Sequence, residues 1–330
     1  RFSLDNTMSA RPFATTEKPD VSIIIVSWNT KDLLAACLAS IDRFTTGISY
    51  EIWVVDNGSV DGTPAMLRER YPNIHLMEPG TNLGFARANN LALRCARGRY
   101  VLFLNPDTEL RSNVLLDFTE RMDREQDIGV LGCRLVGPDG KTQLTCAATY
   151  PTPWNALCEG LFLHRLAVGR PALKFLSSRS LEHWDHATER EVDCLSGAFL
   201  FCRLAAVDNV GGFDEAYFMY GEDLDLCLRV KRDDWRVVYQ PSHEVLHVGA
   251  SSSRQTDFSF ARVQQHRAVR RLLNLHWGRF RVFRYECAVA VGAFSRLAVF
   301  GLASAFPHRR RKEMARHLRL TWSVLTQTLA

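Results

Sequence analysis

The amino-acid sequence predicts an α/β protein with a doubly wound, mostly parallel β-sheet. Between residues 21 and 125, short apolar runs alternate four times with segments of helical spacing, and in each pair the strand comes first. This order is typical of parallel strands joined by helical crossovers. The 330 residues are also 46% hydrophobic and 23% charged, which is the composition of a folded protein large enough to bury a proper core.

The four strands are predicted from continuous apolar runs. Residues 21–26 read VSIIIV, and a strand needs this character when both of its faces are covered. Similar runs follow at residues 51–55, 74–77 and 100–104. These segments should therefore lie in one buried sheet.

The four helices are predicted from apolar residues three and four positions apart and from start signals. Residues 30–41 carry Leu33, Leu34, Cys37, Leu38 and Ile41 at helical spacing. Thr63 followed by Pro64 indicates an N-cap and a proline in the first turn, so a helix should run from there to about residue 71. Further helices are expected at residues 85–95 and 113–125.

Polar residues gather directly after each predicted strand. They include Ser27, Asn29, Asp56, Asn82, Asn105 and Asp107. In a doubly wound sheet, ligands bind beyond the carboxyl ends of the strands. The backbone preferences of Asn, Asp and Gly explain any one such turn, but four turns at one edge favour a ligand site.

The ligand class follows from the motifs that the sequence has and lacks. No glycine-rich dinucleotide fingerprint follows the first strand, and the chain has no P-loop motif, which argues against a Rossmann oxidoreductase and a P-loop NTPase. Asp56 and Asp107 are carboxylates, which hold a divalent cation that bridges phosphates or accept hydrogen bonds from a base or ribose. The edge therefore suits a nucleotide diphosphate with Mg²⁺ or Mn²⁺.

The net charge of +5 conceals two oppositely charged parts. Residues 262–330 contain 14 Lys and Arg against two acids, whereas residues 1–261 contain 27 against 34. A basic tail on an acidic body indicates contact with a polyanion, either nucleic acid or an anionic membrane face. Nine scattered cysteines indicate small buried residues in a reducing compartment. Residues 1–20 lack the pattern of a signal peptide, so the body should stay in the cytoplasm.

Seven short motifs occur in the order found in a known family. They are VSIIIVSWN (21–29), VVDNGSVDGT (54–63), NLGFARANN (82–90), FLNPDT (103–108), GGFDE (211–215), GEDLD (221–225) and HVG (247–249). As an ordered set they resemble the inverting glycosyltransferase family 2 of GT-A fold. The resemblance implies a transferase domain at residues 20–260, with a nucleotide-sugar half at 20–135 and an acceptor half at 136–260. A loose leader at 1–19 and a basic helical tail at 261–330 flank it.

The resemblance also implies roles for the edge residues. Asp56 is similar to the aspartate that bonds the nucleotide base, with Asn29 and Ser27 at the same edge. Asn82, Arg87 and Asn90 would line the nucleotide side near the diphosphate, although Arg87 could equally be a solvated helix residue.

The metal site implied by the resemblance departs from the family pattern. Asp107 matches the metal-binding carboxylate of the Asp-x-Asp motif, whereas Asn105 replaces its first aspartate and is left to bond a ribose hydroxyl. His247 resembles a further metal-site residue, with a structural role as the alternative.

An inverting transfer needs one base that takes the proton of the acceptor hydroxyl. Asp223 matches the catalytic base of the family, and Glu222 beside it is a second catalytic candidate. Glu222 and Asp225 lie three residues apart at the start of a helix expected near Gly221, where the helix dipole alone favours acids. Aromatic residues nearby would raise a carboxyl pKa or simply form core; they are Phe213, Tyr217, Phe218 and Tyr220.

The tail has the composition of a helix that lies on a membrane. A helical segment from Phe260 precedes residues 285–306, which are mainly apolar but are interrupted by Glu286 and Arg296 and flanked by arginines. A spanning helix needs about 20 apolar residues with few charges, so an interfacial helix on anionic headgroups is favoured. A last amphipathic helix should end near residue 329. The alternative is a helical subdomain that docks on the body or forms a homo-oligomer.

The sequence therefore predicts a metal-assisted, inverting glycosyltransferase at the cytoplasmic membrane face, acting on a nucleotide-diphosphate sugar and a lipid-linked saccharide. The Asn-Pro-Asp variant resembles the rhamnosyltransferase branch of cell-wall and polysaccharide synthesis. This branch implies dTDP-rhamnose as donor, with a UDP-sugar as the alternative, and a polyprenyl-diphosphate-linked N-acetylglucosamine as acceptor. One rival is a nucleotidyltransferase, whose basic, glycine-rich loop does not follow the first strand. Another is a non-catalytic scaffold. No base-reading motif supports nucleic-acid binding.

Overall fold

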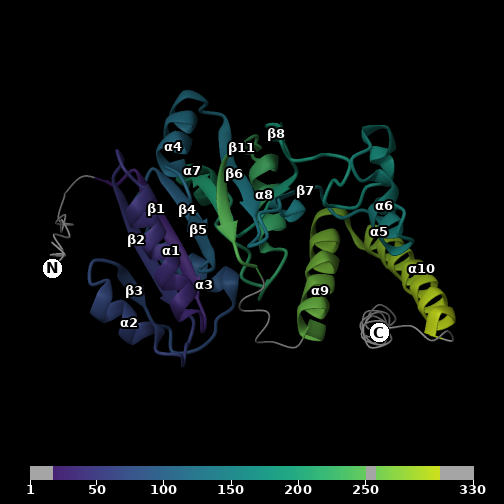
Figure 1. Cartoon of the computed structure of the whole chain (residues 1–330), viewed down its shortest axis with the longest axis horizontal. Helices are drawn as coiled ribbons and strands as arrows, with labels where there is room; N and C mark the ends of the chain where they lie inside the picture. The colour runs from purple at the N-terminus through teal and green to yellow at the C-terminus, as the bar shows by residue number, and fades with distance from the viewer. Residues whose placement is uncertain (1–17, 250–257, 305–330) are drawn as a thin grey trace, which may run out of the picture.

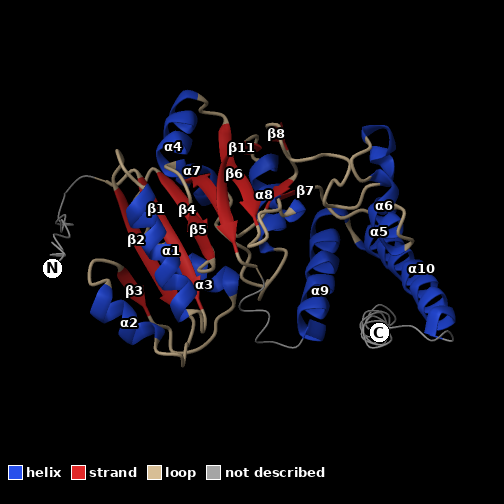
Figure 2. Cartoon of the chain, in the orientation of Figure 1, coloured by secondary structure: helices blue, strands red, loops and turns tan. Residues whose placement is uncertain are grey.

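A single mixed β-sheet forms the centre of the molecule. The computed structural model describes residues 18–249 and 258–304. The sheet has the strand order β3-β2-β1-β4-β10-β6-β11-β5, with β8 paired to β11, and helices surround it (Figure 2). The four strands at one side of this order run parallel, as the sequence predicts, whereas β10 inserts antiparallel between β4 and β6.

The first half of the chain supplies the parallel strands and their crossover helices. Every residue of β1 is buried, which explains the unbroken apolar run in its sequence. The elements are β1 (Val21–Ser27), α1 (Lys31–Phe44), β2 (Tyr50–Asp56), α2 (Thr63–Arg70), β3 (His75–Met77), α3 (Phe85–Leu93), β4 (Tyr100–Leu104), β5 (Thr108–Leu110) and α4 (Val114–Arg124).

The second half completes the same sheet and adds a small lobe. The lobe contains β7 (Ala147–Ala148) paired with β9 (Cys194–Leu195), α5 (Pro153–Gly160), α6 (His164–Ala167) and two 3₁₀ turns, η1 (Leu144–Cys146) and η2 (Pro171–Leu176). The sheet strands are β6 (Ile128–Val136), β8 (Arg190–Glu191), β10 (Phe199–Arg203) and β11 (Arg236–His247), accompanied by α7 (Leu204–Asn209) and α8 (Glu222–Arg232). Both halves thus share one sheet.

Two long helices follow the sheet. They are α9 (Phe258–Trp277), which contacts α8, and α10 (Arg279–Ser304), which packs on α5 at the side of the molecule away from β1 and β2 (Figure 1). Among the described residues, no helix has the length and apolar character needed to span a membrane. The predicted leader and the last amphipathic helix lie outside the described residues.

Two details of the predicted elements are wrong. The N-cap of α2 is Gly62, in a left-handed conformation, and not Thr63, whose hydroxyl instead donates to Asp61 Oδ1 at 2.6 Å. The cysteines are all free thiols, but two of them, Cys95 and Cys287, are exposed. Both lie on helices or at helix ends, where spacing alone does not distinguish a half-buried position from a core position.

Candidate active site

Asp56 lies at the end of β2 with its carboxylate almost fully buried. Its Oδ2 accepts a hydrogen bond from the Ser59 N–H at 2.9 Å, whereas its Oδ1 has no hydrogen-bond partner in the structure. Asn29 lies beside it, because its N–H donates to Ser59 Oγ at 2.8 Å and its Oδ1 accepts from the Val60 N–H at 2.8 Å. A buried acceptor without a donor is costly, and an N–H of a nucleotide base would satisfy it.

The turn after β3 is held by hydrogen bonds from Asn57 and Asn82 and packs against Phe218. Asn57 donates through Nδ2 to Asn82 Oδ1 at 2.9 Å and accepts from the Leu83 N–H at 2.8 Å, while Asn82 Oδ1 also accepts from the Gly84 N–H at 2.9 Å. Gly84 has φ +82°, and a Cβ there would lie 2.5 Å from the Phe218 carbonyl oxygen. The Asn82 oxygen is therefore committed to the turn, and the turn touches the acceptor-side loop.

Asn90 fastens α3 to the same loop. Its Nδ2 donates to the Phe213 carbonyl at 2.8 Å and its Oδ1 accepts from the Phe213 N–H at 2.9 Å. Arg87 and Arg94 both pair with Glu215, at 3.4 Å and 2.8 Å. These contacts give Asn90 and Arg87 a structural role in holding residues 213–215, and their predicted role beside a diphosphate stays a prediction.

Ser27 and Asn105 occupy the first and fourth turns. Ser27 is fully buried and its hydroxyl lies 2.9 Å from that of Thr30, so the side chain is part of the turn. The Asn105 N–H donates to the Ala198 carbonyl at 3.1 Å, and its own carbonyl accepts from the Thr108 hydroxyl at 2.7 Å. The backbone of Asn105 is thus fixed between β4 and the segment that leads into β10.

Asp107 and His247 meet at the edge formed by β5 and β11. His247 Nε2 lies 3.4 Å from Asp107 Oδ1, and Asp107 Oδ2 accepts from the Gly249 N–H at 3.1 Å. Gln143 orients the imidazole, because its Nε2 donates to the His247 carbonyl at 2.8 Å and its Oε1 lies 2.7 Å from His247 Nδ1. His247 Nδ1 must then be the donor, and in the neutral ring the Nε2 lone pair faces the carboxylate.

This pair fits a divalent cation. An imidazole lone pair and a carboxylate oxygen are both acceptors, and facing one another they suit a cation placed between them. Magnesium is often held by one or two protein ligands together with substrate phosphates and water. Within residues 18–249 and 258–304, no group of three or more His, Cys, Asp or Glu side chains gathers around one point.

Asp223 lies in the first turn of α8, at the point where the two halves of the site meet. Its Oδ2 accepts from the Gly197 N–H at 3.0 Å and its Oδ1 from its neighbour Leu224 N–H at 2.8 Å. Gly197 adjoins Ala198, the residue that binds the Asn105 N–H, so the base candidate and the Asn-Pro-Asp turn are connected through one short segment. Desolvation raises the pKa of Asp223, although its backbone hydrogen bonds act in the opposite direction.

Glu222 is buried behind Asp223. Only 6% of the residue is exposed, and its Oε2 has no hydrogen-bond partner in the structure. Desolvation, together with the negative charge of Asp223, raises the pKa of Glu222 to about 8. Two backbone N–H groups stabilise the charged form of Asp223, whereas Glu222 Oε2 has no partner among the described residues, so Asp223 is the better candidate for the base.

Asp225 belongs to a different network. Its Oδ2 accepts from Arg229 Nε at 2.7 Å and its Oδ1 from His276 Nε2 at 2.7 Å, so it connects α8 to α9. Of the aromatic residues expected around the acids, Phe213 packs edge-on against Phe85 and Phe103 in the core, and Phe218 is 41% exposed.

Two residues beside the site could not be identified from the sequence. Arg179 lies close enough to Asp223 for its positive charge to lower the pKa of that carboxyl, and its Nε donates to the Thr149 carbonyl at 3.2 Å. Gln143 holds His247 as described above. Both come from the segment between β6 and β9, which has few periodic patterns, and neither carries a motif of its own.

Comparison with known proteins agrees with this arrangement. The family model described as glycosyl transferase family 2 matches residues 22–181. N-acetylglucosaminyl-diphospho-decaprenol L-rhamnosyltransferase of Mycobacterium tuberculosis is 33% identical over 247 residues, which cover 70% of this chain and 76% of that protein. Rhamnosyltransferase WbbL of Escherichia coli is 26% identical over 71% of this chain and 85% of its own length.

Solved structures share the fold. The mannosyltransferase PcManGT from Pyrobaculum calidifontis, in complex with GDP-Man and Mn²⁺, aligns with a TM-score of 0.55 at 16% identity and covers 95% of this chain and 88% of its own. TarS residues 1–349 of S. aureus align with a TM-score of 0.50 at 17% identity, covering 93% and 92%. The ordered motifs, the mixed sheet with its polar carboxyl edge and the similarity to the mycobacterial enzyme lead to one conclusion: this chain belongs to glycosyl transferase family 2 and is a glycosyltransferase.

Proposed function

We propose that the enzyme transfers L-rhamnose, with inversion at the anomeric carbon, from dTDP-rhamnose to a lipid-linked saccharide in cell-wall or surface-polysaccharide synthesis. The observation that carries the mechanism is the position of Asp223. Two backbone N–H groups hold its carboxylate beside the Asn-Pro-Asp turn. The relatives named rhamnosyltransferases support the choice of sugar, and the mycobacterial one supports an acceptor of the N-acetylglucosaminyl-diphospho-polyprenol type.

Each candidate residue of the site would have a separate role in the reaction. The base of the nucleotide would donate to the unpartnered Oδ1 of Asp56. Asp107 and His247 would hold Mg²⁺ or Mn²⁺, which when bound neutralises charge on the leaving diphosphate. Asp223 would accept the proton of the acceptor hydroxyl as its oxygen attacks the anomeric carbon from the face opposite the diphosphate. The raised pKa of Glu222 favours its neutral form, which adds no second negative charge beside that base.

A lipid-linked acceptor requires the enzyme to work at a membrane, and we place it peripherally at the cytoplasmic face. The positive charge of residues 262–330 supports this location, because anionic headgroups attract such segments.

The test is transfer by the purified protein with a panel of dTDP-, UDP- and GDP-sugars and a short-chain prenyl-diphosphate N-acetylglucosamine, in Mg²⁺, Mn²⁺ or EDTA. We expect turnover with dTDP-rhamnose alone, a product of inverted anomeric configuration, and loss of turnover in EDTA and in Asp107→Ala. Preference for another donor would contradict the assignment of the sugar, and a retained configuration would contradict the mechanism.

A further inference from the structure

The first turns of α10 carry an alternation of arginine and phenylalanine, in which Arg281 is half-buried and the other arginines and phenylalanines are exposed. The segment reads RFRVFR from Arg279 to Arg284. Phe280 and Phe283 are 72% and 62% exposed. Two hollows flank the segment, one of about 390 Å³ lined in part by Arg279 and Phe283 and one of about 410 Å³ lined in part by Phe280, Arg281 and Arg284.

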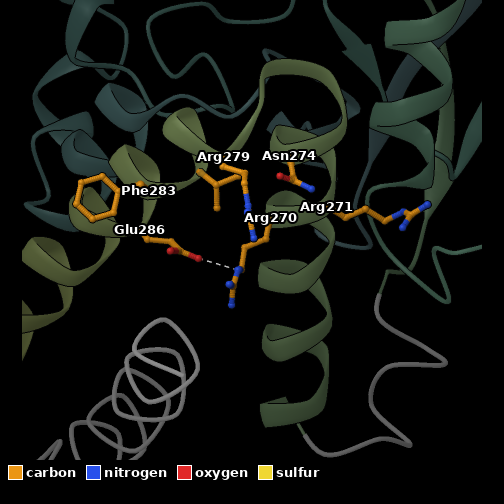
Figure 3. A pocket seen from close by; sticks show the side chains of 7 residues that line it. Arg270, Arg271, Asn274, Arg279, Phe283 and Glu286 are labelled. Atoms are coloured by element: carbon orange, nitrogen blue, oxygen red, sulfur yellow. Dashed lines mark ion pairs between the residues drawn. The ribbon is translucent and has the colours of Figure 1, made fainter.

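The arginines of this region differ in what they bind. Arg270 pairs with Glu286 at 2.6 Å across the first hollow (Figure 3), and Arg271 pairs with Asp214 at 2.6 Å. Arg279, Arg281 and Arg284, by contrast, have no acidic partner among the residues that the structure describes, and the Arg281 guanidinium lies 4.9 Å from the centre of the Trp277 ring. No carboxylate of residues 18–249 or 258–304 therefore balances these three positive charges, which lie at the positive end of the helix dipole.

The exposed side of α10 continues as an apolar stripe. Exposed residues recur three and four positions apart at Phe280, Phe283, Cys287, Val291, Phe294 and Ala298. The opposite side packs on α5 so tightly that a Cβ on Gly160 would lie 2.6 Å from the Gly292 Cα. The apolar stripe therefore faces away from the body of the protein.

We infer that this surface, which we call the Arg-Phe surface and define as Arg279–Arg284 with the stripe to Ala298, docks the enzyme on an anionic lipid bilayer. The inference rests on the proposed function for the presence of a lipid-linked acceptor. The arginines would contact headgroups while Phe280, Phe283 and Phe294 enter the boundary with the acyl chains, so that α10 lies along the membrane plane.

The positive charge of the Arg-Phe surface favours an anionic bilayer over two other occupants, residues 305–330 and a second copy of α10. Residues 305–330 carry six Lys and Arg against one acid, so charge disfavours packing of this segment beside the three arginines of this surface. A second copy of α10 would bring the same three positive charges. An anionic bilayer supplies both the opposite charge and the apolar interior.

The first test is flotation of the 330-residue chain, without substrates, with vesicles of phosphatidylcholine containing about 30% phosphatidylglycerol. Arg279→Gln/Arg281→Gln/Arg284→Gln should weaken binding roughly a hundredfold, because each arginine near an anionic surface contributes about one kilocalorie per mole. The matched control is Arg43→Gln/Arg70→Gln/Arg124→Gln, which removes three exposed arginines from other helices and should bind like the wild type. Equal affinity of the two triple variants would overturn the proposal.

The second test uses the two exposed thiols as reporters. A polarity-sensitive fluorophore on Cys287 should shift to the blue when vesicles are added, whereas the same label on Cys95 should not, each in a variant with the other residue changed to Ser. Slow labelling of Cys287 relative to Cys95 would show that the stripe is covered by the chain itself. A dimer that Phe280→Ser/Phe283→Ser dissociates would show a second copy there. Either result would overturn lipid docking. Transfer is measured separately with a water-soluble acceptor, so neither result bears on the proposed transferase activity.

Discussion

Gln143 holds His247 by two hydrogen bonds at once, one to the backbone carbonyl at 2.8 Å and one from the ring Nδ1 at 2.7 Å. The amide can satisfy both only with its NH₂ group toward the carbonyl and its oxygen toward the ring. This orientation directs His247 Nε2 toward Asp107, 3.4 Å away. A residue with no motif of its own thus determines which nitrogen is available for a metal.

We expect Gln143→Leu to weaken Mn²⁺ binding about 10- to 100-fold, because loss of a partner that orients a histidine ligand has this effect. Gln143→Glu keeps an acceptor for Nδ1 and should retain most of the affinity. Titration calorimetry with Mn²⁺ and a nucleotide diphosphate measures both variants. Equal affinities in Leu and Glu variants would mean that the imidazole is not a ligand.

Gly84 should be less replaceable than Gly80, although both have positive φ. Alanine at Gly80 would meet no atom within 4 Å, whereas alanine at Gly84 would meet the Phe218 carbonyl oxygen at 2.5 Å. We expect Gly80→Ala to cost about 1 kcal/mol from backbone strain. Gly84→Ala should cost about 2 kcal/mol more, because the acceptor-side loop must move and because φ 82° with ψ 173° is a conformation that essentially only glycine adopts. Urea unfolding gives both values. Similar losses of unfolding free energy in the two variants would show that the close approach of Gly84 to Phe218 does not limit the residue at this position.

Glu222 should make the protein less stable at alkaline pH. Its pKa is raised to about 8 in the folded protein by desolvation and by the charge of Asp223, so the folded state binds this proton more tightly than the unfolded state. Its favourable contribution is present below the pKa of the unfolded chain and is lost as the pH rises through the folded pKa. Between pH 6 and pH 9, the free energy of unfolding of Glu222→Gln should rise relative to that of the wild type by on the order of 2 kcal/mol. Parallel curves of unfolding free energy against pH for the two proteins would refute the raised pKa.

Asp225 should stabilise the fold and not take part in the chemistry. It is 1% exposed and accepts from both Arg229 and His276. Removing one member of such a buried pair leaves the other charge without a partner, and we expect Asp225→Ala to cost about 3 kcal/mol. A double-mutant cycle with His276→Ala should show coupling of about 1 kcal/mol. Absence of coupling would mean that this contact does not hold α9 to α8.

Part of this architecture is predictable because its causes are local. The strands β1 to β4 are buried runs of apolar residues, and the polar turns that follow them lie at one edge because parallel strands end there. The sequence does not predict the antiparallel strand β10, since Phe199–Arg203 is too short a run to reveal its partners. Its pairing with β4 nevertheless places Gly197 and Ala198 between Asp223 and Asn105.

In the candidate site, too, residues in local motifs can be predicted from the sequence, whereas residues placed by tertiary contacts cannot. Asp107, His247 and Asp223 belong to ordered motifs and could be named from the sequence. Gln143 and Arg179 could not, because they reach the site only through tertiary contacts of an irregular segment. Asn90 shows the converse, since its motif predicts a ligand contact but does not reveal the hydrogen bonds of its side chain to the Phe213 backbone.

The most direct test of the account is the single-turnover rate of Asp223→Asn at saturating donor and acceptor, with donor affinity measured separately and Glu222→Gln as the neighbouring control. The amide has nearly the same size as the carboxylate but cannot accept the proton. We predict that Asp223→Asn binds the donor like the wild type and transfers at least about 10³-fold more slowly, whereas Glu222→Gln keeps most of the rate. Transfer by Asp223→Asn within about tenfold of the wild-type rate would contradict the assignment of Asp223 as the base.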